Sequence, residues 1–198
     1  MNLIVNLSET TPIGRLTFGV TIIAYFILVI DIIKNKDKTT ESQSFFTWFL
    51  WLILDYVLFI ATDKVHGSDL PLIYGSVIGS FSISVSLLFM KKIKWGENEW
   101  INLILVIITL FFWFITRSAK VGIVFAVASE IIAGIQQMKA SWRNPGTKLT
   151  LVSYVFFIAS YVLALLDAPN WNIENTLFPL AFLIYCIGDT TPLIKKYF

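Results

Sequence analysis

The sequence predicts an all-α integral membrane protein with seven transmembrane helices. Hydrophobic residues make up 57% of the 198 residues and charged residues only 14%, and the mean hydropathy is +0.76. Soluble domains carry about 25% charged residues, so this chain has too few to cover a surface that faces water. Its apolar residues also fall into seven runs, each close to the length that crosses a hydrocarbon core of about 30 Å.

The seven runs are separated by short polar loops such as KNKDKTTESQ and KASWRNPGTK, which leave no room for a soluble domain. The second and fourth runs are short for a span, and we expect them to borrow flanking residues. The seventh contains the single cysteine, Cys186, which excludes an intramolecular disulfide and is interpreted as a packing residue. We expect helices over residues 12–33, 45–61, 70–90, 101–115, 121–138, 149–166 and 177–193.

The lysines and arginines predict the orientation. Eleven of the fifteen follow the first, third and fifth runs or lie at the C-terminal end. Cytoplasmic loops carry the excess of these residues, so we expect the N-terminus outside and the C-terminus in the cytoplasm. The expected location is a bacterial inner (plasma) membrane, although the short loops are equally compatible with a eukaryotic one.

The two halves of the chain resemble each other. A shift of 105 residues aligns VIDIIKNKDKT with GIQQMKASWRN and DYVL with SYVL, and a shift of about 108 aligns Pro71 with Pro179. We therefore predict two parallel three-helix bundles, residues 1–95 and 119–198, joined by a linker helix within 96–118. The linker run, INLILVIITLFFWFI, carries no charge. Repeated halves are a common plan of transporters, with the substrate site between the halves near the midplane.

The stretch IDIIKNKDKTTESQSFFTWFLW resembles the PQ-loop signature, in which a Pro-Gln pair ends a helix and a Thr-Trp-x-x-Trp sequence opens the next. The 3+1+3 layout is likewise similar to the PQ-loop and SWEET-like (MtN3) seven-helix superfamily. That resemblance implies a transporter or a receptor of this fold. Ile30-Asp31 and Ile135-Gln136 stand where the family has Pro-Gln, so the proline hinges do not carry over. What carries over is Gln136 at the second glutamine position and Asp31 in place of the first.

Four carboxylates lie inside the predicted spans, at Asp31, Asp55, Glu130 and Asp189. An ionisable group deep in a bilayer is costly unless it is paired or hydrated, and it marks a functional site by default. No lysine or arginine is placed to neutralise both Asp55 and Glu130, so we expect them to line a pathway and to exchange protons. Their alternative role is as helix-packing groups. That role is favoured for Asp189 and for Asp31, which Lys34 reaches by i, i+3 spacing.

Aromatic residues accompany these acids. Ser44, Trp48, Trp51 and Asp55 follow one another at intervals of four, three and four, which places them on one helix face. Trp51 is deep enough to line a cavity, whereas Trp48 fits a cavity and an interfacial anchor equally well.

Tyrosines occupy matching positions of the repeat. Tyr25 aligns with Glu130, and Tyr56 aligns with Tyr161. We expect these side chains to present polar tips to a central site, with simple packing as the alternative. In the third run, Gly75 and Gly79 are four residues apart and predict close helix packing.

We therefore expect a membrane transporter that moves a small polar solute by alternating access. Proton coupling through Asp55 or Glu130 and passive facilitation both fit these residues. The alternatives are a non-transporting receptor of the same fold, similar to the KDEL receptor, and a structural or assembly protein. The expected partners are the lipid bilayer and a solute of unknown identity, and homo-oligomers are left open. The net charge of +2 gives no footprint for nucleic acid. No catalytic motif or cofactor loop is recognisable, and the lone His66 makes no metal site.

Overall fold

The chain folds into seven helices over the residues described by the computed structural model, which are 10–35, 45–65, 68–90, 93, 95 and 97–198. Ser44 and His66 lie outside the described residues, and so does the side chain of Gln136. The helices are α1 (Pro12–Lys34), α2 (Phe45–Val65), α3 (Leu70–Phe89), α4 (Glu97–Thr116), α5 (Ala119–Arg143), α6 (Lys148–Asp167) and α7 (Ile173–Tyr197). All seven are long and apolar enough to span a membrane. The prediction of an all-α chain with seven such helices is confirmed.

The helices differ from the predicted spans mainly at their ends. α2 continues to Val65, α4 begins at Glu97, and α5 continues to Arg143. These extensions contain charged and polar residues, which interrupt an apolar run but are compatible with an α-helix. The apolar runs therefore mark the part of each helix suited to hydrocarbon, and the helices themselves are longer.

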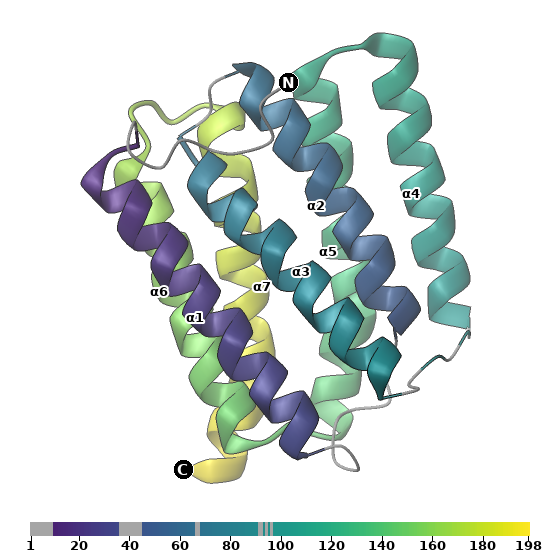
Figure 1. The fold of residues 1–198 in the computed structure, drawn as a ribbon, viewed down its shortest axis with the longest axis vertical. Coiled ribbons are helices and arrows are strands. Elements are labelled where there is room, and N and C mark those ends of the chain that lie inside the picture. Colours follow the sequence, from purple (N-terminus) through teal and green to yellow (C-terminus); the bar gives the residue numbers. More distant parts are fainter. Residues whose placement is uncertain (1–9, 36–44, 66–67, 91–92, 94, 96) are drawn as a thin grey trace.

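Six of the helices form a closed ring, and the seventh lies against its outside. Around the ring the order is α1, α3, α2, α5, α7 and α6, and α6 returns to α1. α4 packs on α5 and α2 from the outside and stands at one edge of the molecule (Figure 1). Its outward side chains, among them Phe111, Phe114 and Ile115, are exposed and apolar, as expected of a surface covered by lipid.

Side-chain caps determine where several helices begin. The Thr11 hydroxyl accepts a hydrogen bond from the Gly14 amide at 2.8 Å, just before Pro12 opens α1. At α6, Thr147 accepts from the amides of Leu149 and Thr150, and the Thr150 hydroxyl accepts from the Thr147 amide. These caps satisfy amide groups that the first turn of a helix leaves without partners.

Two glycines of α3 allow α1 to approach closely. A Cβ atom built on Gly79 would lie 2.1 Å from Cγ of Tyr25, and one built on Gly75 would lie 2.9 Å from Cγ2 of Thr21. The Tyr25 ring therefore rests directly on the backbone of α3. The predicted close packing at Gly75 and Gly79 is confirmed, and it fixes the Tyr25 ring at the centre of the ring of helices.

Candidate functional site

A small cavity lies at the centre of the ring and is lined by all six of its helices. Its volume is about 30 Å³, which is room for about two water-sized groups. The lining residues are Tyr25, Leu28, Trp48, Trp51, Asp55, Ser76, Glu130, Gln137, Tyr154, Phe157, Tyr161, Phe178, Phe182, Tyr185 and Cys186.

Asp55 and Glu130 meet at this cavity from opposite halves of the chain. Asp55 is 5% exposed and Glu130 is 2% exposed, and the two lie within electrostatic range of each other. The Ser80 hydroxyl donates a hydrogen bond to Asp55 Oδ2. Neither carboxyl oxygen of Glu130 has a hydrogen-bond partner among the described residues. A buried carboxyl without a partner is costly, so this geometry is one that a bound proton or ligand would improve.

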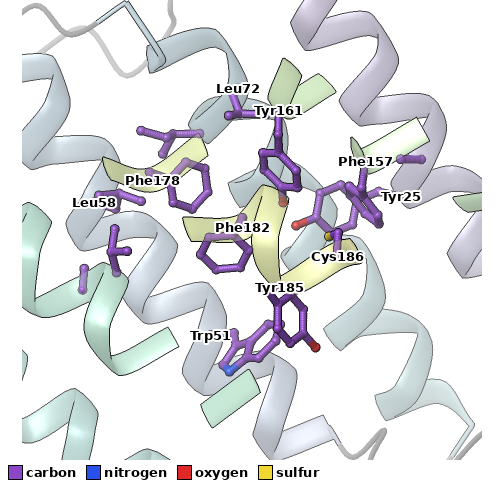
Figure 2. Packing of buried hydrophobic residues seen from close by; sticks show 14 of the residues in the cluster. Tyr25, Trp51, Leu58, Leu72, Phe157, Tyr161, Phe178, Phe182, Tyr185 and Cys186 are labelled. Carbon is purple, nitrogen blue, oxygen red and sulfur yellow. The ribbon is translucent and has the colours of Figure 1, made fainter. Parts of the chain in front are cut away.

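Aromatic rings form most of the cavity wall. Trp51 packs edge-on against Trp48, with ring centroids 5.3 Å apart, and against Tyr185 at 6.5 Å. Figure 2 shows Trp51 and Tyr185 side by side, with Phe182 and Tyr161 continuing the wall. The indole N–H groups of both tryptophans are buried and have no acceptor among the described residues. Trp48 is 4% exposed, so in this structure it belongs to the cavity wall.

The wall continues toward Asp189 of α7, which is 0% exposed. Tyr154, Tyr185 and Ser141 lie next to its carboxyl group, and each has a hydroxyl that can donate to it. Gln137 donates from Nε2 to the Tyr154 hydroxyl at 3.4 Å, and its own Oε1 has no partner among the described residues. Asp189 therefore borders the site without lining the cavity itself.

Two predicted site residues lie elsewhere. Tyr56 is 41% exposed and points out of the bundle, because a helix turns about 100° between Asp55 and its successor. The expectation that Tyr56 presents its tip to the central site is therefore wrong. Asp31 is buried between α1 and α6, where it accepts hydrogen bonds from Thr147, Thr150 and Asn35. Its described partners do not include Lys34, whose side chain is exposed.

Several cavity residues were missed at the sequence level, among them Gln137, Tyr154 and Tyr185. A signal for them exists. Gln137 follows Glu130 by seven residues, and Tyr154 precedes Tyr161 by seven, which is two helical turns in each case. In α7, Phe178, Phe182, Tyr185 and Asp189 repeat the four, three and four spacing that marked the stripe of α2.

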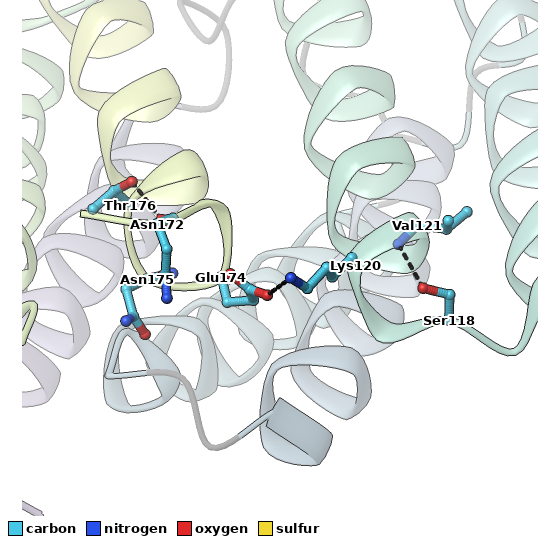
Figure 3. Close-up of polar contacts among 7 residues, drawn as sticks. All are labelled: Ser118, Lys120, Val121, Asn172, Glu174, Asn175 and Thr176. Carbon is cyan, nitrogen blue, oxygen red and sulfur yellow. Dashed lines mark hydrogen bonds and ion pairs between the residues drawn. The ribbon is translucent and has the colours of Figure 1, made fainter. Parts of the chain in front are cut away.

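Polar contacts tie the helices together at the opposite end from the C-terminus. Lys120 Nζ lies 2.7 Å from Glu174 Oε1 and links the first turns of α5 and α7 (Figure 3). Asn175 Oδ1 accepts from the Ser68 amide at 3.0 Å, and the Thr11 hydroxyl donates to the Asp167 carboxylate. Burial raises the pKa of the Asp69 carboxyl, which precedes α3 at this end, to about 7.

Comparison of the chain with protein-family models, with curated proteins and with solved structures gives no match. The described part of the chain also contains no group of three or more His, Cys, Asp or Glu residues placed to hold a metal ion. The candidate site is therefore defined by its own geometry.

Proposed function

We propose that the protein is a membrane transporter that moves a small polar solute by alternating access, with Asp55 and Glu130 as its proton-binding groups. The observation that carries this proposal is the Glu130 carboxyl, buried at the central cavity with no partner for either oxygen among the described residues. Burying a carboxyl group without a partner lowers the stability of the fold. A role in binding protons and solute alternately would explain why the chain keeps Glu130 at this position.

The order of helices in the ring supports a division into two halves. If α1 is exchanged with α5, α3 with α7 and α2 with α6, each pair of consecutive helices in the ring becomes another consecutive pair. Such an arrangement fits two three-helix units, residues 1–95 and 119–198, with α4 as the linker. In this proposal the chain is a relative of the PQ-loop and SWEET-like proteins, with its N-terminus outside and its C-terminus in the cytoplasm.

The location of the two acids fits the same mechanism. Asp55 belongs to the first unit and Glu130 to the second, and α2 and α5 pack against each other. Rocking of one unit against the other would separate the two carboxyl groups and expose them in turn to each side. A cavity of about 30 Å³ admits little besides water-sized groups, so a larger solute would enter only after the two units move apart.

Reconstitution into liposomes tests this function. A pH gradient is imposed, and the internal pH and solute uptake are followed with a panel of sugars, amino acids, amines and nucleosides. We expect at least one class of solute to move protons with it in the wild type. We expect that movement to be lost in Asp55→Asn and in Glu130→Gln. The exposed Asp63 lies on the same helix as Asp55, and Asp63→Asn is expected to retain it.

Solute flux that is unchanged in both Asp55→Asn and Glu130→Gln would overturn the assignment. Absence of any flux in the wild type would favour the receptor or the assembly protein. Orientation is tested separately with single cysteines introduced into the loops, because Cys186 is buried and gives little background labelling.

A further inference from the structure

We infer that the cavity selects a small organic ammonium ion, a primary or methylated amine carried as a cation. The inference rests on the proposed function, because it takes the cavity as the solute site. It adds the chemical class of the solute, which the proposed function does not specify.

The first support is the sign of the charges at the cavity. Asp55 and Glu130 line it, whereas no lysine or arginine of the described chain does. The described lysines lie at the helix ends, for example Lys64 over Trp113 and Lys195 over Trp142. An anionic solute would meet two buried carboxyl groups with no cation to offset them. A cation would pair with the Glu130 carboxyl, which has no partner among the described residues.

The second support is the aromatic wall. Trp48, Trp51, Tyr161 and Tyr185 line the same cavity as the two acids, together with phenylalanine rings. Aromatic faces attract cations through the ring quadrupole, tryptophan most strongly, and groups of such rings are used to bind quaternary and methylated ammonium groups. A sodium or metal ion, in contrast, prefers a shell of oxygen atoms.

The third support is the set of polar atoms without partners. At the cavity, and among the described residues, these are the carboxyl oxygens of Glu130, Oε1 of Gln137, the Tyr185 hydroxyl and the indole N–H groups of Trp48 and Trp51. An ammonium group donates to the oxygens, and a hydroxyl or carbonyl oxygen elsewhere on the same solute accepts from the indoles. A cavity of about 30 Å³ holds the ammonium group alone, so a larger solute requires the halves to part.

Binding of matched probes to the purified protein in nanodiscs tests the inference. Choline is compared with 3,3-dimethylbutan-1-ol, its uncharged isostere, and methylammonium with sodium at equal ionic strength. Binding is followed by calorimetry and by tryptophan fluorescence. We expect choline or methylammonium to bind at least tenfold more tightly than its comparison compound. We also expect Glu130→Gln and Trp51→Leu each to weaken that binding at least tenfold. Trp171 is 75% exposed, and Trp171→Leu is expected to bind as the wild type does.

The inference would be overturned if neither ammonium ion bound more tightly than its comparison compound, or if neither bound at all. Retained cation binding in both Glu130→Gln and Trp51→Leu would overturn it as well. The two proposals fail separately. If a neutral solute moved with protons and no cation bound, the ammonium selectivity would be contradicted and the transporter function would be retained. If cations bound in a manner that depends on Glu130 but no flux occurred in liposomes, the ammonium-binding site would be retained and the transport function would be contradicted.

Discussion

Ser80 donates a hydrogen bond to Asp55 Oδ2 over 2.5 Å, and this contact joins α3 to α2 beside the central cavity. Both residues are buried. Removing the donor in Ser80→Ala leaves that oxygen without its partner, so we expect a loss of about 1–3 kcal/mol of stability. The measurement is the apparent unfolding temperature in detergent.

Ser84→Ala is the matched control for Ser80→Ala. Ser84 is equally buried, but its hydroxyl bonds to the Ser80 carbonyl oxygen of its own helix. Such back-bonding adds little stability, so we expect a change below about 0.5 kcal/mol. Equal losses of stability in the two variants would show that the hydrogen bond from Ser80 to Asp55 contributes no additional stability.

Gly79 of α3 lies directly against the Tyr25 ring of α1. The Cβ atom of alanine would lie 2.1–2.4 Å from three atoms of the Tyr25 ring, so the ring has to move or the helices have to separate. We expect Gly79→Ala to destabilise the protein by about 1–3 kcal/mol through overpacking. It should also weaken solute binding, because Tyr25 lines the cavity. Unfolding temperature and ligand affinity are both measured.

Gly19→Ala serves as the control, because nothing lies within 4 Å of a Cβ atom at Gly19. Alanine favours a helix over glycine by about 1 kcal/mol, so this variant should be neutral or more stable. If Gly79→Ala matched it, the close approach of Tyr25 would not hold in the membrane-bound protein.

Asp31 fastens α1 to the beginning of α6. Its carboxylate accepts from Thr147 at 2.6 Å and from Thr150 at 2.5 Å, the two residues that also cap α6. Asp31→Ala should therefore loosen the first turn of α6. We expect faster hydrogen exchange of the amides of residues 149–152, by tenfold or more, since bonds to a charged group contribute about 1.5–3 kcal/mol each.

Asp63→Ala removes an exposed carboxylate instead and should leave that exchange unchanged. Protection of residues 149–152 that survives Asp31→Ala would mean that the threonine caps hold α6 without help from α1.

Asp69 gives the protein a pH dependence outside the membrane-spanning segments. The carboxyl is 2% exposed, and burial raises its pKa from 3.8 to about 7. The folded protein therefore holds this proton between about pH 4 and 7, where the unfolded chain has released it. Stability contributed by the protonated group is present below about pH 4 and is lost as the pH rises to about 7.

Asp69→Asn removes this dependence, because asparagine does not ionise. The variant should gain on the wild type as the pH rises from 4 to 8, by at most about 1.4 kcal/mol per unit of pKa shift. Unfolding temperatures of both proteins across this range give the difference. A difference that stays constant with pH would place the titration of Asp69 near its ordinary value.

Prediction from the sequence was most accurate for residues that share a face of a single helix. The spacing of Trp48, Trp51 and Asp55 predicted a shared face, and the three residues line one cavity. Tyr56 shows the limit of aligning the two predicted repeats, because Tyr161, which aligns with it, lines the cavity while Tyr56 faces outward. A match between two positions of a predicted repeat does not determine which way either side chain points, whereas helical spacing from a known cavity residue does.

Composition and hydropathy alone determined the seven helices, because an apolar run of that length is stable as a helix in a bilayer, where its backbone has no water to bond to. Only the tertiary structure decided which helices became neighbours. That order places Asp55 of α2 and Glu130 of α5 at the same cavity. It also lets Ser80 donate a hydrogen bond to Asp55, whereas Glu130 has no partner among the described residues. These contacts depend on packing between distant helices, where glycines such as Gly79 decide how closely two backbones approach.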